Sequence, residues 1–176
     1  MRSFVAVTVF SLFAACQAPP PSEPELTDED RQEIASEIER LSGEMLELTR
    51  PEDMEAQLAF WSPSAESYFV GEPALFAQGV RVIRTMQGLR DFFDPSAWNR
   101  QRTNFTILAS RVALPSPVSA LQVMEGHFSA TNLEGETGPE YPWSATATWV
   151  KEDGTWKLLH FHQSWTDTPM ESETEG

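Results

Sequence analysis

The sequence predicts a single α+β domain in which helices come first and a curved antiparallel sheet follows. Three observations lead to this class. Apolar residues in the first half recur at three- and four-residue spacing, as on one face of a helix. From Thr103 onward apolar residues alternate with polar ones, as in strands that bury one face. Helices followed by a run of antiparallel strands favour a sheet with helices packed on one of its faces.

Three helices are predicted in the first half. Thr27 and Asp30 have the spacing of a capping box, and the helix after them has an apolar face made of Ile34, Ile38, Leu41, Met45 and Leu48. Pro51 ends this helix and can begin a second one, whose apolar side carries Met54, Leu58 and Trp61. A third helical pattern runs from Val82 through Met86 and Leu89 to Phe93 and stops at Asp94-Pro95. Ser67 to Val70 is a short β-favouring segment.

Four strands are predicted in the second half. The first begins at Thr103 and ends before Pro115-Ser116-Pro117, and the second covers Val118 to Thr131. A Gly-rich connection from Asn132 to Pro139 follows. The last two strands, Tyr141 to Lys151 and Thr155 to Trp165, are joined by Glu152-Asp153-Gly154, which is a hairpin turn signal.

The N-terminus has the pattern of an exported protein. Arg2 precedes an uncharged apolar stretch from Phe4 to Ala15, which is too short to span a bilayer because a transmembrane helix needs about 20 residues. Residues 1–15 are therefore interpreted as a signal peptide. Cys16 directly after Ala15 resembles a bacterial lipobox, with Phe13 where that motif usually has Leu. The resemblance implies a lipidated Cys16; the alternative is an ordinary signal peptide that ends near a cysteine.

Composition sets the remaining boundaries and excludes several classes. Residues 16–26 are a Pro- and acid-rich linker, residues 27–165 the folded domain, and residues 166–176 an acidic tail that we expect to be disordered. A net charge of −15 argues against a nucleic-acid partner, because phosphate binding depends on Lys and Arg. The single cysteine excludes an internal disulfide framework. We expect membrane contact through the lipid anchor only, on the periplasmic side, and Gln17 favours the outer over the inner membrane by resemblance to bacterial sorting rules.

The last hairpin, from Trp149 to Ser164, has Trp156 after a Gly-containing turn and ends in His160-x-His162-x-Ser164. This run resembles the C-terminal hairpin of the nuclear transport factor 2-like superfamily, and most closely its SnoaL-like and DUF4440-type group. The resemblance covers about Asp28 to Trp165. It implies a cone-shaped antiparallel sheet wrapped by the N-terminal helices, an open-ended cavity, and homodimerisation through the sheet. Functions in this superfamily range from isomerase to binding module, and the fold does not decide between them.

The candidate pocket residues come from this hairpin and from other aromatic and polar positions. Strict alternation along the last strand places Trp156, Leu158, His160, His162 and Ser164 on one face, so that both histidines would line the cavity toward its mouth. The other expected pocket residues are Trp61, Tyr68, Trp98 and His127. One alternative is that the histidines are hydrogen-bonded structural residues. Another is a metal site formed by His127, His160 and His162, although we expect no metal and no other cofactor.

Catalysis would require a proton-transferring pair inside the cone. Glu125 and His127 are the candidates if their shared strand face is internal, and Asp91, Asp94 and Tyr68 are weaker ones. Solvent exposure of Glu125 is the competing expectation, since acidic side chains are rarely buried unpaired. The sequence favours a non-catalytic, membrane-anchored lipoprotein domain that binds an apolar small molecule or a protein partner. The alternative is a small-molecule isomerase, cyclase or hydratase in which His and carboxylate share proton transfer.

Overall fold

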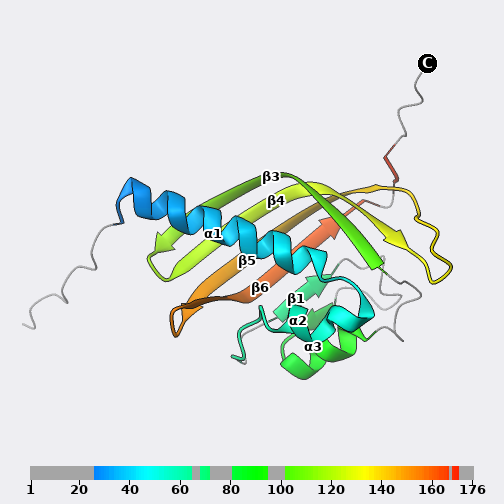
Figure 1. Cartoon of the computed structure of the whole chain (residues 1–176), viewed down its shortest axis with the longest axis horizontal. Helices are drawn as coiled ribbons and strands as arrows, with labels where there is room; N and C mark the ends of the chain where they lie inside the picture. Colours follow the sequence, from blue (N-terminus) through cyan, green and yellow to red (C-terminus); the bar gives the residue numbers. More distant parts are fainter. Residues whose placement is uncertain (1–25, 65–67, 72–80, 95–101, 167, 171–176) are drawn as a thin grey trace, which may run out of the picture.

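Helices pack against one curved sheet in the computed structural model, which describes residues 26–64, 68–71, 81–94, 102–166 and 168–170 (Figure 1). The helical elements are α1 (Asp28–Glu47), the short 3-10 helix η1 (Pro51–Asp53), α2 (Met54–Leu58) and α3 (Met86–Phe93). The strands are β1 (Tyr68–Gly71), β2 (Arg81–Ile83), β3 (Arg102–Ser116), β4 (Ser119–Thr131), β5 (Tyr141–Glu152) and β6 (Thr155–Trp165).

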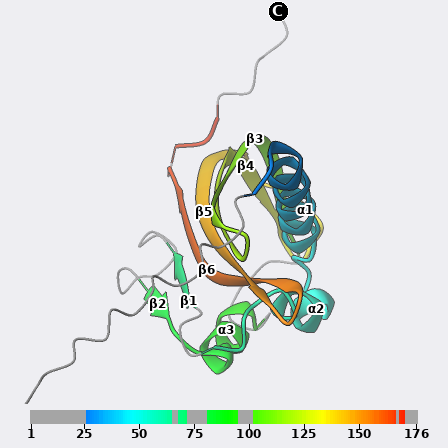
Figure 2. The same cartoon turned by 90° about the vertical axis from the view of Figure 1, so that its left-hand side faces the viewer.

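The described strands form one six-stranded sheet in the order β2-β1-β6-β5-β4-β3. Neighbouring strands are antiparallel except β1 and β6, which run parallel. The long strands curve around α1, which lies on the concave side, whereas β1, β2, α2 and α3 gather beside β6 (Figure 2). The predicted α+β class, with a curved sheet wrapped by N-terminal helices, is confirmed, with one parallel strand pair that the alternation pattern does not reveal.

The first helix begins and faces the sheet as the sequence predicts. The Thr27 hydroxyl accepts the backbone N–H of Asp30 at 3.1 Å, and the Asp30 carboxylate accepts the backbone N–H of Thr27 at 3.0 Å, which completes the capping box. The Thr27 hydroxyl also donates to the Asp30 carboxylate, and this bond, followed by the one from the Thr27 backbone N–H, holds the pKa of Asp30 below its usual value. The buried side chains of α1 are Ile38, Ser42, Met45 and Leu46. They form one stripe, which packs toward the sheet.

The third predicted helix is too long at its start. Val82 lies in β2, which pairs with β1, and α3 begins only at Met86. The reason is a local cap: the Thr85 hydroxyl accepts the backbone N–H of Gly88 at 3.0 Å, so Thr85 stands just outside the helix in an extended conformation. The β-branched residues Val82 and Ile83 therefore form part of a strand, in which Ile83 is buried and Val82 is exposed. The β-favouring segment at Ser67 to Val70 corresponds to β1.

The four long strands match their predicted ranges closely. The β5–β6 turn has positive φ at Asp153 (49°) and Gly154 (81°), which is the requirement of a two-residue type I′ hairpin turn. β6 also contains an irregularity that the sequence does not predict. Thr148 pairs with His160 and Trp149 pairs with Leu158, so Leu159 is an extra residue, a β-bulge. The bulge reverses the faces of all β6 residues after it.

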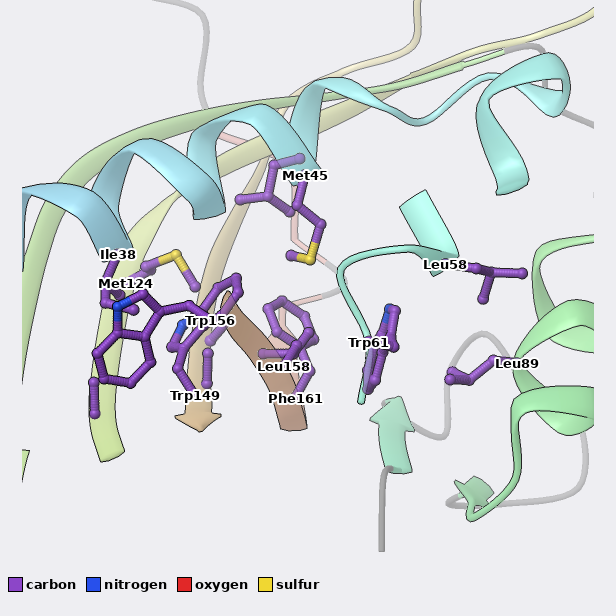
Figure 3. Close-up of a cluster of buried hydrophobic side chains, with 14 of the residues drawn as sticks. Ile38, Met45, Leu58, Trp61, Leu89, Met124, Trp149, Trp156, Leu158 and Phe161 are labelled. Atoms are coloured by element: carbon purple, nitrogen blue, oxygen red, sulfur yellow. The ribbon is translucent and has the colours of Figure 1, made fainter. Parts of the chain in front are cut away.

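Packing on the concave face forms the core. Ile38 and Met45 of α1 lie over the sheet residues Met124, Trp149 and Leu158, as Figure 3 shows. Toward the short helices, Trp61 lies between Phe161 and the helical residues Leu58 and Leu89 in the same view. Cross-strand partners project to the same side of a sheet, so the strand register assigns every paired residue to the concave or the convex face.

The chain ends are described only in part. The predicted signal peptide, nearly all of the linker and the last six residues of the tail lie outside the described residues. In the part of the tail that the structure describes, the backbone N–H of Met170 donates to the Glu140 carbonyl at 2.8 Å. None of the helices in the described ranges has the length and apolar character needed to cross a bilayer.

Candidate site on the concave face of the sheet

The terminal histidines lie on the convex face, opposite to the predicted one. His160, His162 and Ser164 pair with Thr148, Thr146 and Ser144, whereas Trp156 and Leu158 are buried on the concave side. Strict alternation would have kept all of these β6 residues together, but the bulge at Leu159 shifts the later ones by one position. The prediction that His160 and His162 continue the concave lining is therefore wrong.

His160 and His162 are neighbours on the convex face but differ in exposure. His160 is half-buried and His162 is exposed. Burial lowers the pKa of His160 below its usual 6.5, and the adjacent His162 lowers that pKa further. Tyr68 pairs with His160 through the backbone of β1. Trp98 lies outside the described residues, so its place in a pocket stays a prediction.

The second predicted pair, Glu125 and His127, also faces away from the helices. Glu125 is exposed on the convex face opposite Ala109, and His127 Nδ1 lies 3.2 Å from a carboxylate oxygen of Glu140. The pair therefore does not reach the concave face, which corrects the hypothesis of an internal acid–base pair. The competing expectation, an exposed Glu125, is what the structure shows. Asp91 is exposed and accepts a hydrogen bond from Gln87 at 2.8 Å, and Asp94 is exposed.

The alternative three-histidine metal site is not formed. His127 is on β4 while His160 and His162 are on β6, with β5 between them. His127 is also held by Glu140 at the far end of β4. Among the described residues no three His, Cys, Asp or Glu side chains come together as ligands for a metal ion.

The concave face holds a group of aromatic side chains that the sequence does not bring together. They come from the ends of all four long strands, and we call them the aromatic wall: Phe105, Phe128, Tyr141, Trp143 and Trp165. The centroid of the Phe128 ring lies 6.0 Å from that of Phe105 and 5.7 Å from those of Tyr141 and Trp165. Trp143 contacts Phe105 at 5.1 Å and is the one fully buried member. The other four rings keep part of their surface exposed.

One amide stands in this wall. Gln163 lies on the concave face opposite Ala145, and its Oε1 accepts the indole N–H of Trp143 at 3.1 Å. Among the described strand residues of the concave face there is no carboxylate and no imidazole. The cationic Lys151 is at the β5–β6 hairpin, where its Nζ lies 5.5 Å from the centroid of the Trp156 ring. The wall is therefore uncharged, apolar and supplied with one positioned polar group.

Trp61 was predicted as a pocket residue and lies on the concave side. It is buried among Leu58, Leu89 and Phe161, and its indole N–H has no acceptor in the part of the chain that the structure describes. Its membership of a pocket stays a prediction. A separate cleft of about 330 Å³ lies between α1 and the edge strand β3 and is lined by Glu39, Ser42, Ile107, Leu108, Ala109 and Ser110. None of the predicted site residues lines that cleft.

Comparison with solved structures settles the architecture. The dehydrochlorinase LinA-type3 from Novosphingobium barchaimii superimposes with a TM-score of 0.64 at 14% identity, covering 82% of this chain and 95% of that one. An NTF2-like superfamily protein from Salmonella enterica gives a TM-score of 0.57 at 18% identity, covering 86% and 99%. The fold is that of the nuclear transport factor 2-like proteins. The association domain of C. elegans CaMKII shares this fold, with a TM-score of 0.59 at 21% identity over 78% of this chain and 99% of that one.

These likenesses concern the fold alone, since all three identities are low. No protein-family model and no curated protein sequence matches the chain. The nuclear transport factor 2-like fold that the last hairpin suggested is nevertheless confirmed, although the two histidines in that hairpin face away from the cone interior.

Proposed function

We propose that the domain is a non-catalytic binding module whose aromatic wall takes up a neutral, planar, largely apolar small molecule. The observation that carries this proposal is the meeting of five aromatic rings with one fixed amide on a concave strand face that has no carboxylate or imidazole among its described residues. Small-molecule sites have this composition, a mostly apolar lining with few positioned polar groups. Offset and edge-on contacts with the partly exposed rings would add to the hydrophobic gain from burying the ligand.

The alternative function is a small-molecule isomerase, cyclase or hydratase. Its support is the likeness in fold to a dehydrochlorinase. Proton transfer needs an acid or base within hydrogen-bond reach of the substrate. The histidines 127, 160 and 162 and the carboxylate of Glu125 face the convex side, so the described strands favour binding over proton transfer.

The binding proposal predicts a ligand that depends on the wall. An organic extract of the purified mature protein, analysed by mass spectrometry, should contain a neutral apolar compound. Replacing Trp165 by Ala should lower its occupancy about tenfold, because a large aromatic contact on the concave face is lost. The matched control is Leu121→Ala, which removes an exposed apolar side chain from the convex face and should leave occupancy unchanged. Equal loss in both variants, or turnover that depends on Glu125, would contradict the proposal.

We also propose that the mature protein is anchored in the outer membrane by a lipid on Cys16, with the domain on the periplasmic side. The support is the lipobox-like sequence around the single cysteine and Gln17 after it. The prediction is that wild-type protein partitions into the detergent phase of a two-phase separation, while Cys16→Ser remains in the aqueous phase. A Cys16→Ser variant that still enters detergent would show that the lipid is not what anchors the chain.

The third part of the proposal is a homodimer formed through the convex face of the sheet. Leu121 and Val123 lie there side by side on β4 with 43% and 38% of their surface exposed. One of the structures with the same fold is an association domain, a name that denotes assembly. This arrangement would leave the aromatic wall, on the opposite face, accessible to a ligand.

A further inference from the structure

The amide of Gln163 has a defined orientation. An indole N–H can only donate a hydrogen bond, so the atom that it meets at 3.1 Å has to be the oxygen of the amide and not its nitrogen. Trp143 is 3% exposed, so this bond is shielded from competing water. The Nε2 group is therefore the other end of the amide, and it carries two N–H donors.

Among the described residues, the Gln163 side chain makes one hydrogen bond, the one with Trp143. Its two N–H donors therefore have no acceptor there. Gln163 is half-buried and stands on β6 between Phe161 and Trp165, with the small side chain of Ala145 directly across from it on β5. A bound ligand that covers this half-buried donor would displace its water, so the ligand has to bring an acceptor, because a covered and unpaired donor costs free energy.

We infer that Gln163 is the specificity-determining residue of the aromatic wall: its NH₂ group donates to a neutral acceptor, such as the oxygen of a ketone, quinone or ester, on a planar ligand. The inference rests on the proposed binding function and names the chemical class of the ligand. A ligand donor in place of the acceptor would leave the amide N–H groups unpaired. A carboxylate ligand would in addition be repelled by a chain that has a net charge of −15.

The test compares two probes of nearly equal shape, 2-acetylnaphthalene and 2-isopropenylnaphthalene, in which a carbonyl oxygen replaces a methylene group. Dissociation constants for the full mature protein are measured by quenching of tryptophan fluorescence. The wild type should bind the ketone about tenfold more tightly than the hydrocarbon, which is the size expected of one shielded neutral hydrogen bond.

Gln163→Glu at alkaline pH is the informative variant. It keeps the oxygen that Trp143 contacts and the shape of the side chain, but it replaces the two donors by an acceptor. The preference for the ketone should disappear or reverse, while affinity for the hydrocarbon changes less than about threefold. Gln163→Leu should also abolish the preference and serves in its place if the acidic variant does not fold. The control Ser164→Ala, on the convex face, should keep the tenfold preference.

A ligand-free readout checks the orientation itself. The indole N–H resonance of Trp143, identified from its loss in Trp143→Phe, should shift and exchange faster with solvent in Gln163→Leu than in the wild type. If the hydrocarbon binds in a Trp165-dependent way but the ketone binds no better, the inference on Gln163 is overturned and the binding function stands. If neither probe binds, both are overturned.

Discussion

A single buried amide ties four elements of the molecule together. Gln122 on β4 is fully buried, and its Nε2 donates to the hydroxyls of Ser42 on α1 at 2.9 Å and Ser110 on β3 at 3.2 Å. Its Oε1 accepts the indole N–H of Trp149 on β5 at 3.1 Å. Buried polar groups are tolerated when they are paired in this way, and they then fix how the surrounding elements register against each other. At the packed end of the concave face, both ends of the Gln122 amide are thus hydrogen-bonded. At the other end, the NH₂ group of Gln163 has no acceptor among the described residues.

The protein should become less stable as the pH falls, because His160 is then protonated. Because burial lowers the pKa of His160, the unfolded chain binds a proton more readily than the folded one between pH 6.5 and that lowered value. The contribution of the neutral imidazole is fully present above pH 6.5 and is lost as the pH falls through this window. The melting temperature of the wild type should therefore drop between about pH 7.5 and about pH 5.5, and His160→Gln should show a smaller drop.

The neighbouring His162, which also lowers the pKa of His160, provides a control with an intermediate effect. His162→Gln removes the neighbouring imidazole but not the burial of His160, so its drop should lie between those of the wild type and His160→Gln. Thermal melts of the three proteins in matched buffers measure the order. An unchanged drop in His160→Gln would assign the pH dependence to other groups.

At the scale of elements, the curvature of the sheet depends on a close approach between β3 and β4. The register of this pair shifts at Leu108, next to the pairing of Ile107 with Gly126. A Cβ on Gly126 would collide with the backbone carbonyl of Thr106. Glycine therefore allows the bend that brings the aromatic wall toward the helices, and β-bulges commonly accompany such bends.

Two glycine substitutions should accordingly have opposite effects. Gly126→Ala is expected to destabilise the fold by about 1–3 kcal/mol, because the added methyl group overpacks a backbone contact that cannot move away easily. Gly43→Ala, inside α1, meets nothing within 4 Å and should stabilise the protein by up to about 1 kcal/mol, because alanine favours helix. Urea unfolding measures both. Destabilisation by Gly43→Ala, or a neutral Gly126→Ala, would contradict this account of the bend.

Local signals explain which elements could be predicted from the sequence. The capping box at Thr27 and the turn at Asp153-Gly154 depend on a few consecutive residues, so the start of α1 and the last hairpin were predicted correctly. The face of His160 was not, because one bulged residue, Leu159, reverses it and nothing local marks the bulge. The grouping of the five aromatic residues in one wall could not be predicted for a different reason. Its members come from four strands, and only the sheet register brings them together.

At the scale of the whole molecule, the two faces of the sheet differ in a way that favours assembly. The concave face packs against α1 over part of its length, whereas the convex face presents exposed Leu121 and Val123 beside small uncharged residues of β5. These neighbours are Ser144, Thr146 and Thr148. In a chain with 27 acidic residues, the β5 side of this apolar pair is therefore free of charge. Depletion of charged groups is the compositional mark of the core of a protein interface.

The proposed dimer should depend on the apolar centre of the convex face. Replacing Leu121 and Val123 together by Lys should give monomers, because two charges would be buried without partners in each copy. Leu133→Lys is the matched control, since Leu133 is exposed on the β4–β5 connection. Sedimentation velocity of the soluble Cys16→Ser form gives the mass in each case. A control that dissociates equally, or a doubly substituted protein that stays dimeric, would place the interface elsewhere.

A charge swap tests the two-fold geometry of the same interface. Arg111 on β3 pairs directly with Val123, and Glu125 follows Val123 two residues later on β4, so both lie on the convex face beside Val123. Each contact in a two-fold interface occurs twice. If Arg111 of one copy meets Glu125 of the other, Arg111→Glu and Glu125→Arg should each weaken the dimer, because like charges then face each other. Combining the two substitutions should restore it, since the pairs are re-formed with opposite polarity. The dimer dissociation constant, measured at low and at high salt, reports this rescue, and the rescue should shrink as salt screens the charges. Additive weakening in the combined variant would mean that Arg111 and Glu125 do not meet across the interface.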